Sequence, residues 1–282
     1  MAQTKAIMPE PRALSPLPTG TRALLRSGPE AVAYHIPVSP PTFDAPPLKT
    51  TISLPRYSAW TSGLHFHATH TEYLRLVKGA IFVELNGITK RMSALAGGEI
   101  DTNTGQLVRS GLVIEVPRFA RHNWGRSEHY VDTEENNRIK SQPEEWAEEV
   151  IVEEWTDPSD ISKPLFFWNL NGIITAQSDT ALSSRQRIAK RILGDWWIGL
   201  QLFGVFWELD NWPIFINCRN LWPSGGASRG ALWINDCAEA ITSFVVLFVA
   251  KAASMLLDLQ AVEQRRTPAA LWDAYRKSPR DI

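Results

Sequence analysis

Three histidines and one glutamate have the residue types and the spacing that can hold a divalent metal ion. His65 and His67 are two residues apart, so on a β-strand both imidazoles leave the same face. Glu72 follows after a gap long enough for a tight turn and can return on the adjacent strand. His122 supplies a third imidazole, downstream of Pro117. Imidazole and carboxylate ligands suit Fe, Mn, Ni, Zn or Cu and leave positions for water, substrate or dioxygen.

Two other polar residues are weaker candidates for a role in chemistry. His70 falls in the turn between the two strands and outside the ligand spacing, so we expect a surface residue or one that contacts a ligand. Glu84 is a candidate acid or base, although a glutamate on a strand is more often exposed or ion-paired. The chain contains no Gly-x-Ser-x-Gly elbow, Walker loop or Gly-x-Gly-x-x-Gly motif, so neither a serine hydrolase nor a nucleotide cofactor is predicted.

The segments that carry these residues have the pattern of short β-strands. Asn86-Gly87 separates two of them and predicts a type I′ hairpin, because both turn positions need a positive φ. Strands this short and this regularly spaced predict an antiparallel sandwich or barrel. The predicted strands are Thr50–Leu54, Gly63–His67, Tyr73–Val77, Ala80–Leu85, Ile88–Met92, Leu112–Val116 and Val150–Trp155.

Two motifs in this region resemble those of the cupin superfamily. They are His65-x-His67-x4-Glu72-x6-Gly79 and Gly111-x5-Pro117-x4-His122. Cupins are small antiparallel jelly-roll β-barrels, so the resemblance implies that fold over roughly residues 50–158. It also implies that the three histidines and the glutamate of these motifs are the metal ligands.

The second motif departs from the cupin pattern in its loop. Phe119 stands where cupins usually have glycine, and no asparagine falls four residues after His122. We therefore expect the loop to adopt a backbone that does not need a positive φ.

A further tract resembles fungal single-cupin proteins, some of which are encoded beside polyketide synthases and are called cupin-domain oxidoreductases. The tract comprises residues 153–158 (EEWTDP) and 166–172 (FFWNLNG). The resemblance implies a metal-dependent oxidoreductase acting on a hydrophobic small molecule in polyketide or other secondary metabolism. Fe(II) is the favoured metal, with Mn, Zn or Ni as alternatives. Two other functions stay open: a non-redox metal-dependent isomerase, dehydratase or cyclase, and a membrane-tethered cupin that binds a ligand without catalysis.

Composition excludes some classes of protein and indicates a compartment. The 282 residues have a formal net charge of −1, which argues against electrostatic binding of nucleic acid. Two cysteines cannot form a disulfide framework, so a reducing, intracellular location is expected. The first residues lack the apolar core of a secretory signal. Eleven of the 19 prolines fall before residue 56, which predicts an extended, poorly ordered arm.

Two apolar blocks in the C-terminal half indicate a membrane-seeking region. Trp196–Trp207 is too short to span a bilayer, whereas the block that begins at Ala240 reaches spanning length only if it tolerates Lys251. Basic residues flank the pair on both outer sides, which is the pattern of a helical hairpin with both ends cytosolic. These residues are Arg185, Arg187, Lys190, Arg191, Arg265, Arg266, Arg276 and Lys277. A soluble helical cap is the alternative.

The sequence therefore predicts a mainly β fold, with a small antiparallel jelly-roll (cupin) β-barrel followed by a C-terminal helical, membrane-seeking region. The expected partners are a hydrophobic substrate, a membrane bound through 191–260 with the barrel on its cytosolic side, and a second copy of the chain, but no nucleic acid. The expected segments are a Pro-rich arm (1–49), the barrel (50–160), a connector (161–190), an apolar helical region that is a candidate membrane hairpin (191–260) and a polar tail (261–282).

Overall fold

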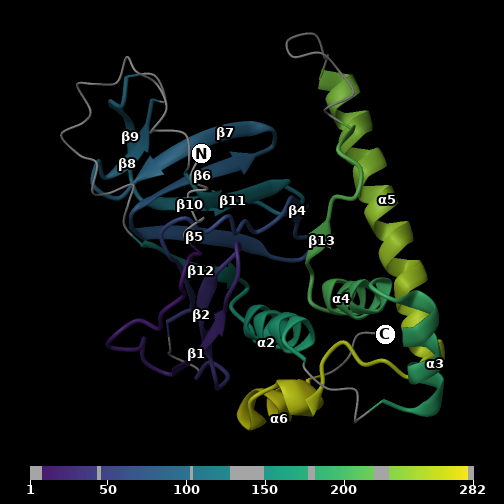
Figure 1. Ribbon diagram of the computed structural model, residues 1–282. Coiled ribbons are helices and arrows are strands. Elements are labelled where there is room, and N and C mark those ends of the chain that lie inside the picture. Colours follow the sequence, from purple (N-terminus) through teal and green to yellow (C-terminus); the bar gives the residue numbers. More distant parts are fainter. Residues whose placement is uncertain are drawn as a thin grey trace, which may run out of the picture. The chain divides into compact units, whose positions relative to one another are not determined.

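The computed structural model describes residues 8–42, 46–101, 104–127, 149–176, 182–218 and 229–278 (Figure 1). The chain divides into two compact units. The sheet unit comprises residues 1–63 and 71–160, and the helical unit comprises residues 64–70 and 161–282.

The sheet unit contains two antiparallel sheets, which confirms the predicted mainly antiparallel β region. In spatial order, the strands of the first sheet are β1 (Thr21–Arg26), β2 (Val32–Pro37), β3 (Thr50–Leu54), β12 (Val150–Asp157), β5 (Thr71–Lys78) and β10 (Val113–Val116). The strands that this unit contributes to the second sheet are β11 (His122–Arg126), β6 (Ala80–Leu85), β7 (Ile88–Ser93), β8 (Gly98–Ile100) and β9 (Leu107–Ser110).

Alternating side chains of these strands form the core of the sheet unit. On β5, Leu74 and Leu76 are buried on the same side of the strand as Glu72. On β6, Ile81 and Val83 are both completely buried. Each such side chain contributes about 1.5–3 kcal/mol through removal of its apolar surface from water. Trp124 of β11 is also fully buried.

The hairpin between β6 and β7 has the turn that the sequence predicts. Asn86 has a φ of 52° and Gly87 a φ of 79°, so both turn positions are left-handed. The turn sets the register, in which Leu85 pairs with Ile88. This register decides which side chains of β6 and β7 share a face.

The N-terminal segment differs from the extended arm expected over residues 1–49. Within it, β1 and β2 pair with each other along six positions, and β2 also pairs with β3. All six residues of β2 are buried. The prolines allow this pairing because Pro29 lies between the two strands and Pro37 ends β2, where no interior ladder bond is lost.

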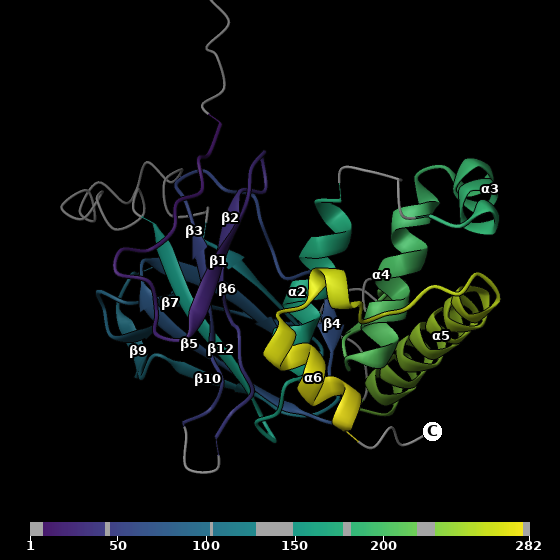
Figure 2. The ribbon, with the colours of Figure 1, turned by 90° about the horizontal axis from the view of Figure 1, so that it is seen from below.

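The helical unit contains five helices and one short strand pair among its described residues (Figure 2). Helix α4 packs against α5, and β4 pairs antiparallel with β13. The predicted helical C-terminal region is thus confirmed, and helices also occupy parts of the expected connector and tail. The elements are β4 (His65–Phe66), α2 (Ser162–Ile174), α3 (Ser184–Leu193), α4 (Trp196–Glu208), β13 (Trp212–Pro213), α5 (Arg229–Leu256), the 3-10 turn η3 (Gln264–Arg266) and α6 (Ala269–Lys277).

One helical segment of the described chain, Trp233–Leu256, is long and apolar enough to cross a membrane, judged by length and composition alone. This segment contains Asp236, Glu239 and Lys251, and the lysine is compensated within the unit because its Nζ lies 2.8 Å from Glu208 Oε2 on α4. Helix α4 itself has 13 residues, fewer than a spanning helix needs.

Arg266, one of the basic residues expected to flank the apolar region, is instead buried within the helical unit. Its side chain is only 7% exposed and donates hydrogen bonds to Asn169 Oδ1 (3.2 Å) and the Gln260 carbonyl (2.9 Å). Burial lowers the pKa of the guanidinium to about 10, against the opposing charge of Glu263. Its alkyl chain fits against Gly172, where an added Cβ would come within 2.7 Å. Arg266 therefore packs the helical unit and offers little charge to a surface.

Candidate metal centre

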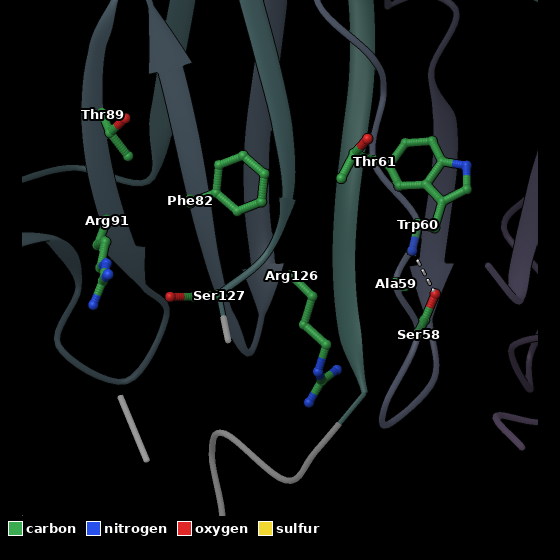
Figure 3. Close-up of a pocket in the computed structure, with 9 residues that line it drawn as sticks. All are labelled: Ser58, Ala59, Trp60, Thr61, Phe82, Thr89, Arg91, Arg126 and Ser127. Carbon is green, nitrogen blue, oxygen red and sulfur yellow. Dashed lines mark hydrogen bonds between the residues drawn. The ribbon is translucent and has the colours of Figure 1, made fainter. Parts of the chain in front are cut away.

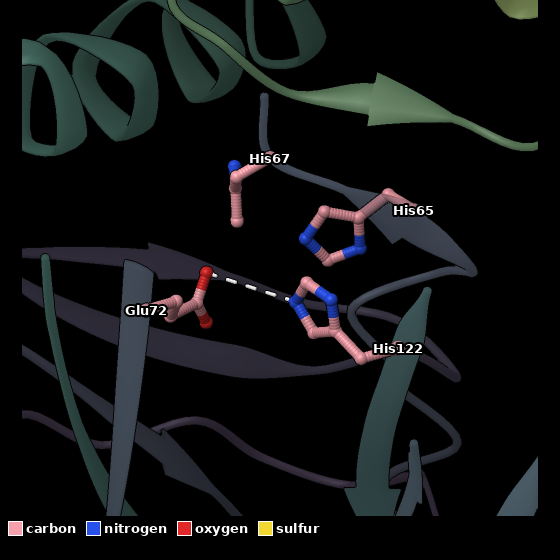
Figure 4. Close-up of side chains that lie close together, drawn as sticks. All are labelled: His65, His67, Glu72 and His122. Carbon is pink, nitrogen blue, oxygen red and sulfur yellow. Dashed lines mark ion pairs between the residues drawn. The ribbon is translucent and has the colours of Figure 1, made fainter. Parts of the chain in front are cut away.

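The four predicted ligands are buried and come together. The ligand atoms of His65, His67, Glu72 and His122 all lie within 4.8 Å of one another. Figure 4 shows the four side chains pointing toward one another. Two atoms that each bind one ion at about 2.1 Å are at most about 4.2 Å apart, so binding requires a contraction of only about 0.6 Å. The group therefore fits a divalent ion.

Glu72 and His122 are placed by the register of the sheet unit. Glu72, at the start of β5, is 1% exposed and pairs with Val116, and His122 begins β11 and is fully buried. His122 Nδ1 lies 3.1 Å from the Ala120 carbonyl, so a proton on Nδ1 leaves Nε2 as the ligand atom. That Nε2 is 3.7 Å from Glu72 Oε2, which is long for a hydrogen bond and suitable for two ligands of one ion.

His65 and His67 are placed by the helical unit, through β4 and the residues that follow it. Pro213 of β13 pairs with His65, and Ile214 N donates to the Leu64 carbonyl at 2.9 Å. The two imidazoles lie edge to face, with ring centres 5.0 Å apart. Neither residue is more than 5% exposed.

Asp210, between α4 and β13, is the functional residue that the sequence did not reveal. Its backbone carbonyl accepts a hydrogen bond from His67 Nδ1. A proton held on Nδ1 leaves Nε2 of His67 as the ligand atom and fixes the rotation of the ring. No motif points to Asp210, because 143 residues separate it from His67.

The carboxylate of Asp210 holds the backbone of the same loop. It accepts hydrogen bonds from Ala68 N (2.8 Å), Thr69 N (2.9 Å), Thr69 Oγ1 (2.7 Å), His70 N (3.1 Å) and Trp212 Nε1 (3.0 Å), and its Oδ2 lies 2.8 Å from His70 Nδ1. Burial by itself would raise the pKa of Asp210, but the bonds from His70 and Thr69 hold that pKa well below its usual range. An ionised Asp210 therefore fastens the loop that carries the two histidines.

The other two candidates take different places. His70 is buried and is not one of the four ligands. Its Nδ1 contacts Asp210, the residue that orients the ligand His67. Glu84 pairs with Asn123 and Thr89. It is the neighbour of Leu85, which pairs with His122, and adjacent residues of a strand point to opposite faces. It therefore lies on the opposite face of β6 from the side that His122 occupies.

The loop before His122 contradicts the expectation for its backbone. Phe119 has a φ of 62°, which is the left-handed conformation that favours glycine. The chain turns there, with Ala120 N donating to the Pro117 carbonyl at 3.0 Å, so the turn geometry prevails over the residue type. The phenylalanine side chain is 66% exposed. A non-glycine residue in this region costs about 1–2 kcal/mol.

Fold and ligand group together define a mainly β protein with a buried histidine–glutamate group that suits a divalent metal. No family profile matches the chain, and no curated protein matches it.

Several solved structures are similar to part of the chain. KdgF from Halomonas sp. is 15% identical, with 47% of this chain and 84% of that protein covered and a TM-score of 0.28. The capsular polysaccharide assembling protein CapF from Staphylococcus aureus is 13% identical over 48% of this chain and 30% of that one, with a TM-score of 0.30. The cupin domain of Cnp3 from Schizosaccharomyces pombe is 13% identical, with coverage of 48% and 69% and a TM-score of 0.26. Likenesses of this size carry no argument about activity, so the function must be argued from the ligand group.

Proposed function

We propose that this chain is a cupin-type metalloenzyme that holds one divalent metal through His65, His67, Glu72 and His122. The observation that carries the proposal is the convergence of these four buried side chains, with ligand atoms within 4.8 Å of one another. Three neutral imidazoles and one carboxylate leave a divalent ion a net positive charge and open coordination positions.

The chain's own residues prepare this centre for a hydrophobic substrate. The Nδ1 atoms of His67 and His122 each face a backbone carbonyl, which directs both Nε2 atoms toward the metal position. Leu74 and Leu76 are buried on the side of β5 that begins with Glu72, so the side chains that follow this ligand along the strand are apolar. When bound, the metal supplies Lewis-acid chemistry and, as Fe(II), electron transfer with dioxygen.

The reaction we favour is oxidation of a hydrophobic small molecule of the polyketide or secondary-metabolite kind, with Fe(II) as the metal. Support comes from the ligand set and from the resemblance of the sequence to cupin-domain oxidoreductases. A non-redox isomerase, dehydratase or cyclase would use the same ligands with Zn or Mn.

Oxygen consumption distinguishes these reactions. The Fe(II)-loaded full chain would be presented with a panel of polyketide-type phenols and hydroquinones in an oxygen electrode, beside His67→Ala treated in the same way. The proposal predicts substrate-dependent oxygen uptake that is lost in His67→Ala. Product formation that proceeds equally under argon would replace the oxidoreductase with the non-redox enzyme.

We further propose that the helical unit binds an anionic membrane surface. Helix α3 carries basic side chains, buries none of its residues and exposes Ile188 (61%) and Ile192 (78%) one turn apart. Trp196, which begins α4, is 73% exposed. Basic side chains beside an apolar stripe and a tryptophan are typical of helices that lie in the membrane interface. The exposed face of α5 adds Ile241, Val245, Phe248 and Val249, each more than 50% exposed.

Co-sedimentation with vesicles tests this membrane proposal. The full chain should sediment with vesicles of phosphatidylcholine and phosphatidylserine, and Ile188→Asp/Ile192→Asp should reduce the bound fraction several-fold. Val108→Asp, which replaces a 63% exposed residue of β9 in the sheet unit, is the matched control and should bind as the wild type does. Equal binding by the two variants would contradict a role for α3.

A further inference from the structure

A cavity of about 370 Å³ lies in the sheet unit, and its volume is in the range of small-molecule sites (Figure 3). Its lining residues are Ser58, Ala59, Trp60, Thr61, Phe82, Thr89, Arg91, Arg126 and Ser127.

The part of the cavity formed by Phe82 and Arg91 lies on the other face of the second sheet from the metal ligand His122. Phe82 pairs with Arg91 on β7, so these two side chains leave the same face of the sheet. His122 pairs with Leu85, three positions along β6 from Phe82, and so leaves the opposite face. The sheet itself therefore stands between the position of His122 and the side of the cavity formed by Phe82 and Arg91.

Gly125 shapes the floor of the cavity. It pairs with Phe82 on one side and with Thr61 on the other. An added Cβ would meet the Phe82 ring at 2.9 Å and Thr61 Cγ2 at 3.0 Å, so only glycine lets these two side chains close over the strand. The result is an apolar surface at this part of the cavity.

The opposite end of the cavity is cationic and carries a hydroxyl group. Figure 3 shows the Ser127 hydroxyl directed toward Arg91, whereas the guanidinium group of Arg126 points away from both. Arg91 makes no ion pair or hydrogen bond with any described residue, and the lining contains no carboxylate. Arg126 is 7% exposed and pairs with Ile81, so its side chain leaves the same face as His122 and contacts the Leu54 and Pro55 carbonyls at 3.5 Å.

Ser127 gives a second and independent indication of a ligand. Its residue is 7% exposed, and its Oγ has no hydrogen-bond partner among the described residues. A buried hydroxyl without a partner costs about 1–3 kcal/mol, which a ligand that accepts its hydrogen bond would remove. The hydroxyl is directed toward the guanidinium group of Arg91 (Figure 3).

We propose that this cavity binds a small aromatic or aliphatic acid. The carboxylate of the ligand accepts hydrogen bonds from Arg91 and Ser127, and its apolar body lies against Phe82 and Thr61. Guanidinium groups suit this role because their planar forks match the two oxygens of a carboxylate. Glu84 shares the sheet face with Phe82 but does not line the cavity, so the acid group enters at the arginine end. The site is independent of the proposed metal chemistry.

Isothermal titration calorimetry with 2-naphthoate tests the proposal, with 2-naphthylmethanol as the uncharged counterpart. We expect one naphthoate per chain and at least about tenfold weaker binding of the alcohol, because charge-assisted hydrogen bonds are lost. Arg91→Gln should weaken naphthoate binding by about tenfold, Arg91→Lys by less, and Ser127→Ala by a few-fold. Arg109→Gln, which changes an exposed arginine of β9, is the matched control and should have no effect.

Two results would overturn the proposal. One is an affinity for naphthoate that is the same in wild type and Arg91→Gln, or absent in the wild type up to millimolar probe. The other is loss of binding in His65→Ala with normal binding in Arg91→Gln, which would place the probe on the metal. Arg91 has no partner within the described chain, so Arg91→Gln should fold normally, and metal content of this variant should equal that of wild type.

Discussion

Strand β6 buries its apolar side chains, whereas helix α5 leaves several of its apolar side chains exposed. Ile81 and Val83 on β6 are completely buried within the sheet unit. On α5, Ile241 is 63% exposed and Phe248 is 55% exposed. The sheet unit thus obtains its stability from its own core, whereas the helical unit leaves apolar surface that another structure can cover.

Helix α5 nevertheless makes specific contacts with β13 of the same unit. Ser243 Oγ on α5 donates to the Pro213 carbonyl at 2.6 Å, and the Phe244 and Trp212 rings are stacked with centres 6.4 Å apart. Trp212 in turn stacks on Phe66, next to His65. The two sides of α5 therefore differ: one side supports the β4–β13 strand pair next to the histidines, and the other side is exposed.

The largest expected effect compares one isoleucine from each unit. Ile81→Ala removes a fully buried side chain and should lower the free energy of unfolding by about 2–5 kcal/mol. Ile241→Ala, at an exposed position, should change it by less than about 0.5 kcal/mol. Urea denaturation followed by tryptophan fluorescence measures both. Equal losses would mean that α5 is covered in solution, and the contrast between the units would not hold.

The contact of Asp210 with the histidine loop should appear in metal affinity. Asp210→Ala removes the acceptor for the loop N–H groups and should weaken metal binding by about 10–100-fold, the usual cost of losing a group that orients a ligand. Competition with a chromophoric chelator measures this affinity. Asp195→Ala is the control, because Asp195 is exposed and makes no side-chain bond at the start of α4. Unchanged affinity in Asp210→Ala would show that the loop keeps its shape without this carboxylate.

These two predictions separate what the sequence could reveal from what it could not. The spacing of His65 and His67 and the Asn86-Gly87 turn are local patterns, and the structure agrees with both. Asp210 could not be found in this way, because its contact with the loop depends on how distant segments fold. The cavity is formed by three separate stretches of the chain and had no local signal for the same reason.

The N-terminal strands and the loop at Phe119 show a second limit of local patterns. Frequent proline predicted an extended arm, but prolines at strand ends permit pairing, and the buried side chains of β2 favour it. Phe119 is locally unsuited to a positive φ, yet the turn that leads to His122 imposes one. In both places the tertiary structure prevails over the local preference.

A smaller effect concerns pH and is confined to the sheet unit. Burial lowers the pKa of His35, although the bond to the Thr51 carbonyl opposes this, and the backbone N–H of Leu14 donates to Nε2 at 2.9 Å. The neutral ring is favoured when folded, so its stabilising effect is complete above about pH 6.5 and is lost as the pH falls toward the lowered value. Urea denaturation between pH 7.5 and 5 should show wild type losing stability relative to His35→Gln. A constant difference over that range would contradict the assignment.

The smallest effect is expected at Phe119. Phe119→Gly should raise the free energy of unfolding by about 0.5–1 kcal/mol, because relief of the side-chain penalty is partly offset by the larger conformational entropy that glycine loses on folding. Phe119→Ala keeps that penalty and should bring no gain. Thermal unfolding of both variants provides the measurement, and stabilisation by alanine equal to that by glycine would assign the effect to the exposed ring instead.

The most direct test of the metal centre is elemental mass spectrometry on the purified full chain, after reconstitution with Fe(II) and removal of unbound metal. We expect about one divalent ion per chain in the wild type and in His35→Gln. His67→Ala and Glu72→Ala should lose that ion, because each removes a ligand. A wild type that holds no metal, or ligand variants that hold as much as the wild type, would contradict the assignment of this group as a metal site.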